Sequence, residues 1–235
     1  LVDIGDKPIL WHIMKMYAHY GHTEFVVPLG YKGFLIKEYF AHYYLHESDV
    51  TFDFGRGGGM TVRQPCLDSW KVTLVDTGRD TLTAGRIRRI RPYLGEEPFM
   101  LTYGDGLSDV NIARLAAFHR AHGRLATVTA VRPAGRFGSL TLDGTGEVTA
   151  FREKPPGDGG WTNGGFFVFQ PEALSYMGGD DTMLEREPLE RLAKDGQLMA
   201  FAHEGFWQPM DTMRDRDLLE QLWRDGAPWK TWRDA

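Results

Sequence analysis

Apolar residues recur along the first two thirds of the chain at helical and strand spacing in alternation. Residues 8–20 place Ile9, Ile13 and Met16 near one helix face, and Gly21 follows as a stop signal. Further helices are predicted at residues 31–45, 84–91 and 110–121. Short buried strands are predicted at residues 25–27, 71–75, 99–103 and 125–131. This order is typical of an α/β fold, so we predict a Rossmann-like, mostly parallel central sheet flanked by helices.

The pattern changes in the last third of the chain. Residues 139–142 and 147–151 read as paired strands around a turn, and residues 165–169 form a continuous apolar run. We interpret this region as a β extension of the sheet that faces a sugar. Helices are predicted at residues 171–176, 187–194 and 211–224, and a strand at 198–202. A hairpin or loop is predicted where residues 50–54 and 61–62 flank the glycine-rich stretch 55–59.

Length and charge exclude several classes of protein. With 235 residues, 42% of them hydrophobic, the chain can bury the core of one domain, which we place at residues 1–235. A net charge of −5 gives no electrostatic footprint for nucleic acid. The single cysteine, Cys66, excludes an internal disulfide and suits a reducing compartment. No apolar run is long enough to span a bilayer, so we expect a cytoplasmic protein without a membrane partner.

Asp105 is the strongest candidate for chemistry. It lies between Gly104 and Gly106, directly after the predicted strand 99–103. Ligands of open α/β sheets bind beyond the carboxyl ends of strands, where glycine lets a phosphate approach and a carboxylate can hold Mg²⁺. The structural alternative is an ordinary turn, because Asp and Gly are common turn residues.

A second acid could complete a cation site with Asp105. Asp211 follows an aromatic and Pro-containing segment, residues 206–210. Its structural alternative is the N-cap of the helix predicted at 211–224, where either Asp211 or Thr212 could serve. If the two distant segments converge, both acids could share one metal ion, which would indicate phosphate chemistry.

Other polar positions are suited to a sugar phosphate. Lys154 could meet a phosphate and Glu153 could accept hydrogen bonds from sugar hydroxyls, although an exposed charge pair beside a turn is the alternative. Asn163 and the glycine that follows suit sugar recognition or a bulge. Gly138 likewise permits close approach of a ligand.

Several motifs of other enzyme classes are lacking. His42 and His46 sit four residues apart without the Glu of a zinc protease, and we interpret them, like His119 and His122, as partly exposed helix residues. The glycine-rich stretch at 55–59 has neither the dinucleotide-binding spacing nor a P-loop ending. No Gly-x-Ser-x-Gly elbow occurs, which disfavours covalent hydrolysis.

With these residues in order, the chain resembles the sugar-1-phosphate nucleotidyltransferases over nearly its whole length. The blocks that carry the resemblance are residues 5–14, 30–33, 72–78, 102–106, 135–138, 153–155, 163–167 and 205–212. The strand-end acids and Glu-Lys-Pro are shared by the family in general. The blocks Val72-Thr73-Leu74-Val75-Asp76-Thr77-Gly78 and Gly205-Phe206-Trp207-Gln208-Pro209-Met210-Asp211-Thr212 favour its cytidylyl branch.

The resemblance implies transfer of a cytidylyl group from CTP to α-D-glucose 1-phosphate, giving CDP-glucose and pyrophosphate for surface polysaccharides. Mg²⁺ would be the cofactor and a homo-oligomer the assembly. The implied roles are metal binding for Asp105 and Asp211, charge neutralisation for Lys154, glucose binding for Gly138, Glu153 and Asn163, a sugar-pocket wall for Trp207, and nucleotide contact for Thr83, Gly85 and Gly104.

The family also has a Gly-rich loop of Gly-Gly-x-Gly-Thr-Arg type that cradles the triphosphate. We expect that loop to lie before Leu1, outside this sequence. A protein without this loop would lose about 10²-fold or more in rate, which is the loss expected when one preorganised hydrogen-bond donor is removed. Two alternatives therefore stay open: a sibling thymidylyl- or uridylyltransferase, and a non-catalytic nucleotide-sugar binding protein.

Overall fold

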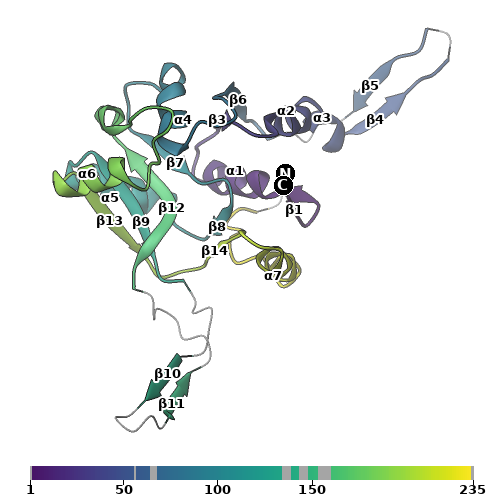
Figure 1. The fold of residues 1–235 in the computed structure, drawn as a ribbon. Coiled ribbons are helices and arrows are strands. Elements are labelled where there is room, and N and C mark those ends of the chain that lie inside the picture. The colour runs from purple at the N-terminus through teal and green to yellow at the C-terminus, as the bar shows by residue number, and fades with distance from the viewer. Residues whose placement is uncertain are drawn as a thin grey trace.

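The computed structural model describes residues 2–55, 57–63, 68–133, 139–142, 148–152 and 160–233, and has an α/β architecture (Figure 1). Its helices are α1 (Ile9–His19), α2 (Gly33–Ala41), α3 (Tyr43–His46), α4 (Thr83–Arg89), α5 (Ile112–His122), α6 (Glu187–Lys194), α7 (Met213–Arg224) and the 3-10 helices η1 (Arg91–Tyr93) and η2 (Pro171–Tyr176). Its strands are β1 (Asp3–Ile4), β2 (Lys7–Pro8), β3 (Glu24–Leu29), β4 (Asp49–Phe52), β5 (Met60–Arg63), β6 (Lys71–Asp76), β7 (Phe99–Thr102), β8 (Gly106–Ser108), β9 (Ala126–Val131), β10 (Ser139–Leu142), β11 (Val148–Arg152), β12 (Thr162–Phe169), β13 (Leu198–His203) and β14 (Trp207–Pro209).

The largest sheet has the strand order β13-β9-β12-β7. Strand β13 runs parallel to β9, whereas β12 is antiparallel to both β9 and β7. Three of the four strands therefore share one direction, and β12 opposes them. Strands β3 and β6 form a separate parallel pair. The predicted α/β class is confirmed, with a mixed sheet at its centre.

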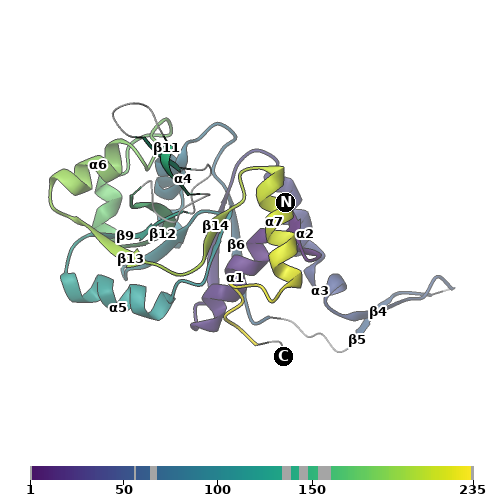
Figure 2. The same cartoon turned by 90° about the horizontal axis from the view of Figure 1, so that it is seen from below.

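Strand β12 is buried on both faces, which explains its continuous apolar run. Because successive side chains of a strand point to opposite faces, Phe166 and Val168 enter one core and Phe167 and Phe169 the other. The first core includes residues of α1, α5 and α7, and the second includes residues of α4, η2 and α6. Figure 2 shows the sheet between α5 on one side and α6 on the other.

A buried histidine joins the two ends of the chain to α1. His12 is fully buried, and its Nε2 lies 2.8 Å from the Ile4 carbonyl oxygen. Trp229 Nε1 donates to His12 Nδ1 at 3.3 Å, so the proton of the ring must be on Nε2, which donates to Ile4. Burial lowers the pKa of His12 to about 4. The neutral ring therefore ties β1 and the C-terminal segment to this helix.

Most predicted elements are confirmed, and two differ. The helix predicted over residues 31–45 begins only at Gly33, because Lys32 takes a left-handed conformation (φ 55°), and it breaks at His42. After the break, Tyr43 receives a hydrogen bond from Trp11 Nε1 and donates one to Asp68. Such tertiary contacts override helix propensity. The helix predicted at residues 171–176 is a 3-10 helix that starts at Pro171.

The interpretation of His119 as partly exposed is wrong. His119 is fully buried, its Nδ1 lies 2.8 Å from Thr127 Oγ1, and its Nε2 lies 3.1 Å from Gln170 Nε2. The ring thus connects α5 to β9 and to the end of β12. In the part of the chain that the structure describes, no helix combines the length and the apolar character needed to cross a membrane.

Candidate active site

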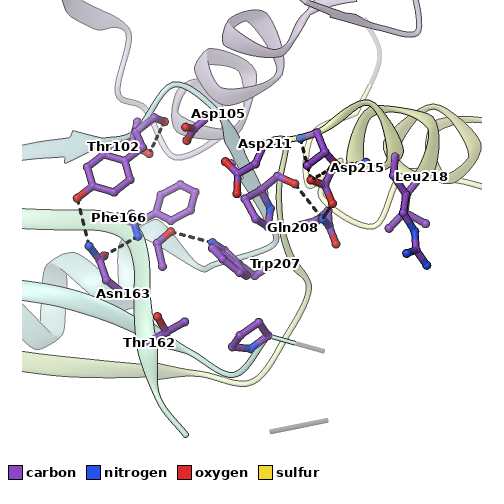
Figure 3. Close-up of a pocket in the computed structure, with 18 residues that line it drawn as sticks. Thr102, Asp105, Thr162, Asn163, Phe166, Trp207, Gln208, Asp211, Asp215 and Leu218 are labelled. Carbon is purple, nitrogen blue, oxygen red and sulfur yellow. Dashed lines mark hydrogen bonds between the residues drawn. The ribbon is translucent and has the colours of Figure 1, made fainter. Parts of the chain in front are cut away.

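Two antiparallel strands bring the predicted acids to one place. Strand β14 pairs with β8 in the register Pro209↔Gly106, and the Met210 amide donates to the Asp105 carbonyl oxygen at 2.7 Å. Asp105 precedes β8 and Asp211 lies two residues beyond β14, so both are at the same end of this strand pair. Figure 3 shows the two carboxylates near one another in a cleft, to whose lining both belong.

The electrostatics of the site confirm that the two acids are close. Partial burial raises the pKa of Asp105, and the negative charge of Asp211 raises it further. Both acids are exposed to solvent, but two like charges this close still repel each other, and a bound cation would offset that repulsion. The pair therefore has the electrostatic character of a cation site.

The structural alternative at Asp211 is wrong, because Thr212 is the N-cap of α7. The Thr212 side chain accepts a hydrogen bond from the Asp215 amide, and the Asp215 carboxylate accepts one from the Thr212 amide. This reciprocal capping box satisfies the start of the helix without the carboxylate of Asp211. Asp211 therefore stands just before the helix, with its side chain among the cleft residues.

The cleft has a volume of about 870 Å³, which is large enough for a nucleotide sugar. Across from the acids it is lined by Asn163, Gly164 and Trp207. The indole Nε1 of Trp207 donates to the Gly164 carbonyl oxygen at 2.8 Å, which fixes the ring against β12 (Figure 3). The predicted sugar-binding residues Asn163 and Trp207 are thus in the same cleft as the two acids.

Asn163 is held in one orientation by its neighbours. The Gly165 amide donates to Asn163 Oδ1 at 2.8 Å, and Asn163 Nδ2 donates to the Tyr103 hydroxyl at 3.2 Å. Asn163 lies next to a register shift in β12, and Gly165 has a positive φ of 79°. A Cβ at Gly165 would meet the Tyr103 ring at 2.8 Å, so glycine is required for Tyr103 to approach.

Thr83 and the two predicted nucleotide-binding glycines do not line the cleft. Thr83 begins α4 and donates to Glu185 Oε2 at 3.0 Å. Gly85 is packed so tightly that an added Cβ would lie 2.6 Å from the Asp180 Cα, which indicates helix packing at this position. Gly104 has open space where a Cβ would be. Their contact with a nucleotide stays a prediction.

Three predicted site residues, Gly138, Glu153 and Lys154, lie outside the described residues. Two residues that the sequence reasoning missed lie close to the site. Tyr103 lines the cleft and donates to Glu185, which also accepts from Thr83. Tyr103 belongs to the same block as Asp105 and could have been found there. Glu185 has no such signal, because its partners are about 80 and 100 positions away.

The residues at the acid end of the cleft fit a hard divalent cation. Asp105 and Asp211 offer carboxylate oxygens, the donors that Mg²⁺ and similar ions prefer. Within the described residues, no group of three or more His, Cys, Asp and Glu side chains gathers into a complete metal cage. An ion held here would therefore complete its coordination with phosphate oxygens and water, as Mg²⁺ does in phosphoryl-transfer sites.

Comparison with known proteins agrees with this fold and identifies the family. The family profile described as nucleotidyl transferase matches residues 1–225. The chain belongs to the nucleotidyl transferase family. Within it, the chain is 53% identical to the glucose-1-phosphate cytidylyltransferase of Salmonella typhi over 99% of this chain and 90% of that protein. It is 46% identical to the probable glucose-1-phosphate cytidylyltransferase of Bacillus subtilis, over 99% of this chain and 91% of that protein.

Solved structures show the same fold at low identity. HddC from Yersinia pseudotuberculosis matches with a TM-score of 0.66 and 18% identity, over 94% of this chain and 88% of that one. A UDP-glucose pyrophosphorylase matches with a TM-score of 0.65 and 12% identity, over 95% of this chain and 89% of that one. At these identities the likeness concerns the fold alone, which confirms the predicted Rossmann-like architecture.

Proposed function

We propose that the protein transfers a cytidylyl group from CTP to α-D-glucose 1-phosphate, giving CDP-glucose and pyrophosphate. The observation that carries the proposal is a gap in identity among its relatives. Three proteins named as glucose-1-phosphate cytidylyltransferases, one of them as probable, are 46–53% identical to the chain. Two proteins of rice named as probable mannose-1-phosphate guanylyltransferases are 29% identical. This gap favours cytidine and glucose over the other bases and sugars.

The chemistry asks the protein mainly for positioning and charge neutralisation. A phosphate oxygen of glucose 1-phosphate attacks the α-phosphorus of CTP, the bond from that phosphorus to the bridging oxygen breaks, and pyrophosphate leaves. No protein nucleophile is needed. The cleft supplies a wall for the sugar through Asn163 and Trp207 and a cation-binding end through the two acids. Lys154, Glu153 and Gly138 keep the roles that the family resemblance gives them.

Mg²⁺ is the cofactor that we propose, with Asp105 and Asp211 as its protein ligands. When bound, the ion neutralises phosphate charge. Asp105 and Asp211 would hold the ion within the cleft that Asn163 and Trp207 also line. The pKa of Asp105, which is raised by desolvation and further by the negative charge of Asp211, supports the assignment, because it reflects two carboxylates close enough to share one cation.

The test is release of pyrophosphate by the purified full-length protein. With Mg²⁺ and glucose 1-phosphate, we expect CTP to support faster release than dTTP, UTP or GTP. Preference for dTTP or UTP would assign the protein to a sibling activity. Binding of CDP-glucose by calorimetry, together with no turnover on any nucleotide, would instead support a non-catalytic binding protein. A cytoplasmic location and a use of CDP-glucose for surface polysaccharide such as O-antigen of lipopolysaccharide remain predictions.

We also propose that the protein is a homo-oligomer that assembles through the β4–β5 ribbon. The ribbon extends away from the body (Figures 1 and 2). Its register places Val50 opposite Val62 and Phe52 opposite Met60, so one face is apolar. The other face carries the polar residues Asp49, Thr51, Thr61 and Arg63.

An isolated two-stranded hairpin is marginal in water, and this one exposes 54% of Phe52 and 45% of Met60. A second copy of the chain presents the same apolar face, and a self-complementary contact of this kind closes by two-fold symmetry. In light scattering, Phe52→Ser with Met60→Ser should reduce the mass of the assembly, whereas Thr51→Ala with Thr61→Ala on the polar face should not. A monomeric wild type would contradict the proposal.

A further inference from the structure

A chain of hydrogen bonds connects the sugar wall of the cleft to the start of α4. Asn163 Nδ2 donates to the Tyr103 hydroxyl, and that hydroxyl donates to Glu185 Oε1. On the other side, Thr83 Oγ1 donates to Glu185 Oε2. Asn163 lines the cleft, whereas Thr83 is the residue expected at the nucleotide. One carboxylate therefore joins a residue of the cleft to the start of α4, 80 residues away in the sequence.

The direction of every bond in this chain is fixed. The Leu184 amide donates to Thr83 Oγ1 at 2.7 Å, so the hydroxyl hydrogen of Thr83 is the one donated to Glu185. The Gly165 amide donates to Asn163 Oδ1, so the amide nitrogen must face Tyr103. Because Tyr103 accepts from Asn163, its own hydrogen goes to Glu185. The hydrogen bonds from both sides are therefore directed towards the Glu185 carboxylate, which accepts from Tyr103 and from Thr83.

This arrangement gives Glu185 control over the Asn163 amide. One N–H of Asn163 is used by Tyr103, and the other is the group that can reach a sugar hydroxyl. If the carboxylate were replaced by an amide, it would present one oxygen and one NH₂ to two hydroxyl donors. Either the Tyr103 or the Thr83 hydroxyl would then have to accept from the new NH₂ group and turn its own hydrogen away from residue 185. At Tyr103 this hydrogen would point towards Asn163, and Asn163 Nδ2 would lose its acceptor.

Resting on the proposed function, we infer that Glu185 is a positioning residue that orients Asn163 through Tyr103 and ties this part of the cleft to the start of α4. Glu185 is not among the residues that line the cleft, so it acts through its neighbours. Tyr103 is rigid enough to transmit the effect, because its amide donates to the Gly165 carbonyl at 3.0 Å and its ring packs on Gly165.

The test compares Glu185→Gln with Tyr103→Phe and with the double variant. In Glu185→Gln we expect KM for glucose 1-phosphate to rise about threefold to tenfold, the range of one net hydrogen bond, with a smaller change in kcat. Tyr103→Phe should give a similar rise. The double variant should be little worse than either single variant, because both remove the same connection. The matched control is Glu190→Gln, an exposed glutamate on α6 that should leave KM unchanged.

The outcomes separate this inference from the function on which it rests. Wild-type turnover with an unchanged sugar-phosphate KM in Glu185→Gln overturns the inference alone. Additive effects in the double variant also overturn it, because Glu185 would then not act through Tyr103. A wild type without turnover on any nucleotide overturns the proposed function and this inference with it. A melting temperature close to that of the wild type in each variant shows that the KM change is not a loss of fold.

Discussion

His12 and Asp105 both have a pKa that the fold shifts, yet His12 is fully buried whereas Asp105 is exposed to solvent in the cleft. His12 has a partner for each ring nitrogen, and burial among four tryptophans leaves it neutral. Asp105 faces a second carboxylate, Asp211, and the pKa of Asp105 is raised. In the first region, burial with complete hydrogen bonding stabilises the fold. In the second, two carboxylates lie close together in an exposed cleft, where we propose that they bind a cation.

The sharpest way to break this contrast is to remove charge from the cation end. Asp105→Asn and Asp211→Asn should each lower kcat for pyrophosphate release by about 10²-fold or more, because each removes half of the carboxylate charge that holds the metal. The control is Asp217→Asn, an exposed acid on α7 that is not among the residues lining the cleft and should leave turnover unchanged. Near-normal turnover in either folded variant would remove that acid from the mechanism.

At the histidine, the expected effect is on stability and not on catalysis. His12→Ala should lower the free energy of unfolding by about 2–4 kcal/mol, because it leaves a cavity and unpaired groups on Ile4 and Trp229. Denaturation with urea measures the change. His19→Ala, at an exposed position of the same helix, should change it by less than about 0.5 kcal/mol. Equal effects in both variants would contradict the role given to the buried ring.

The same histidine predicts how stability depends on pH. The pKa of His12 in the folded protein is about 4, below its ordinary value of 6.5. Between these two pH values the unfolded chain binds a proton at His12 that the folded protein does not bind. This contribution is complete above pH 6.5 and is lost as the pH falls towards 4. Unfolding free energies measured across that window should decline more steeply in the wild type than in His12→Leu. If the unfolding free energies of the two proteins fell in parallel with decreasing pH, His12 would not be responsible for the loss of stability in acid.

On the sugar wall, the expected change is smaller. Trp207→Phe keeps an aromatic wall but loses the indole donor to the Gly164 carbonyl. KM for glucose 1-phosphate should rise about threefold to tenfold, with kcat nearly unchanged. Trp70→Phe, which is outside the cleft lining, is the control. A fall in kcat without a change in KM would place Trp207 at the reacting phosphates instead.

The smallest expected effect is on the melting temperature of the metal-free Asp105→Asn variant, and it tests the repulsion between the two acids directly. The folded pKa of Asp105 is raised, so its charged form opposes folding, and this cost grows as the pH rises through the folded pKa. Without metal at neutral pH, Asp105→Asn should therefore melt at a higher temperature than the wild type, and the difference should shrink as the pH is lowered towards 4. Added Mg²⁺ should raise the melting temperature of the wild type only. A lower melting temperature for the metal-free variant would contradict the repulsion.

The sequence by itself determined most elements and pointed to the two acids that the structure brings together, Asp105 and Asp211. Helices such as α1, the apolar strand β12 and the turn that carries Asp105 depend on local spacing and on glycine, which a linear pattern records. The block around Asp211 was equally clear, but its role was not, because an acid before a helix can be its cap or a ligand. The structure decided only the first point, by giving the cap to Thr212, and the ligand role of Asp211 stays a proposal.

Tertiary structure alone decided which side chains support the site. Glu185 meets Thr83 and Tyr103 because the segment before α6 packs against the start of α4 and the end of β7. The break between α2 and α3, the burial of His119 and the antiparallel course of β12 likewise follow from contacts between distant segments. Local patterns record periodicity and turn chemistry, whereas the partner of a given side chain depends on how whole elements pack, which no local pattern contains.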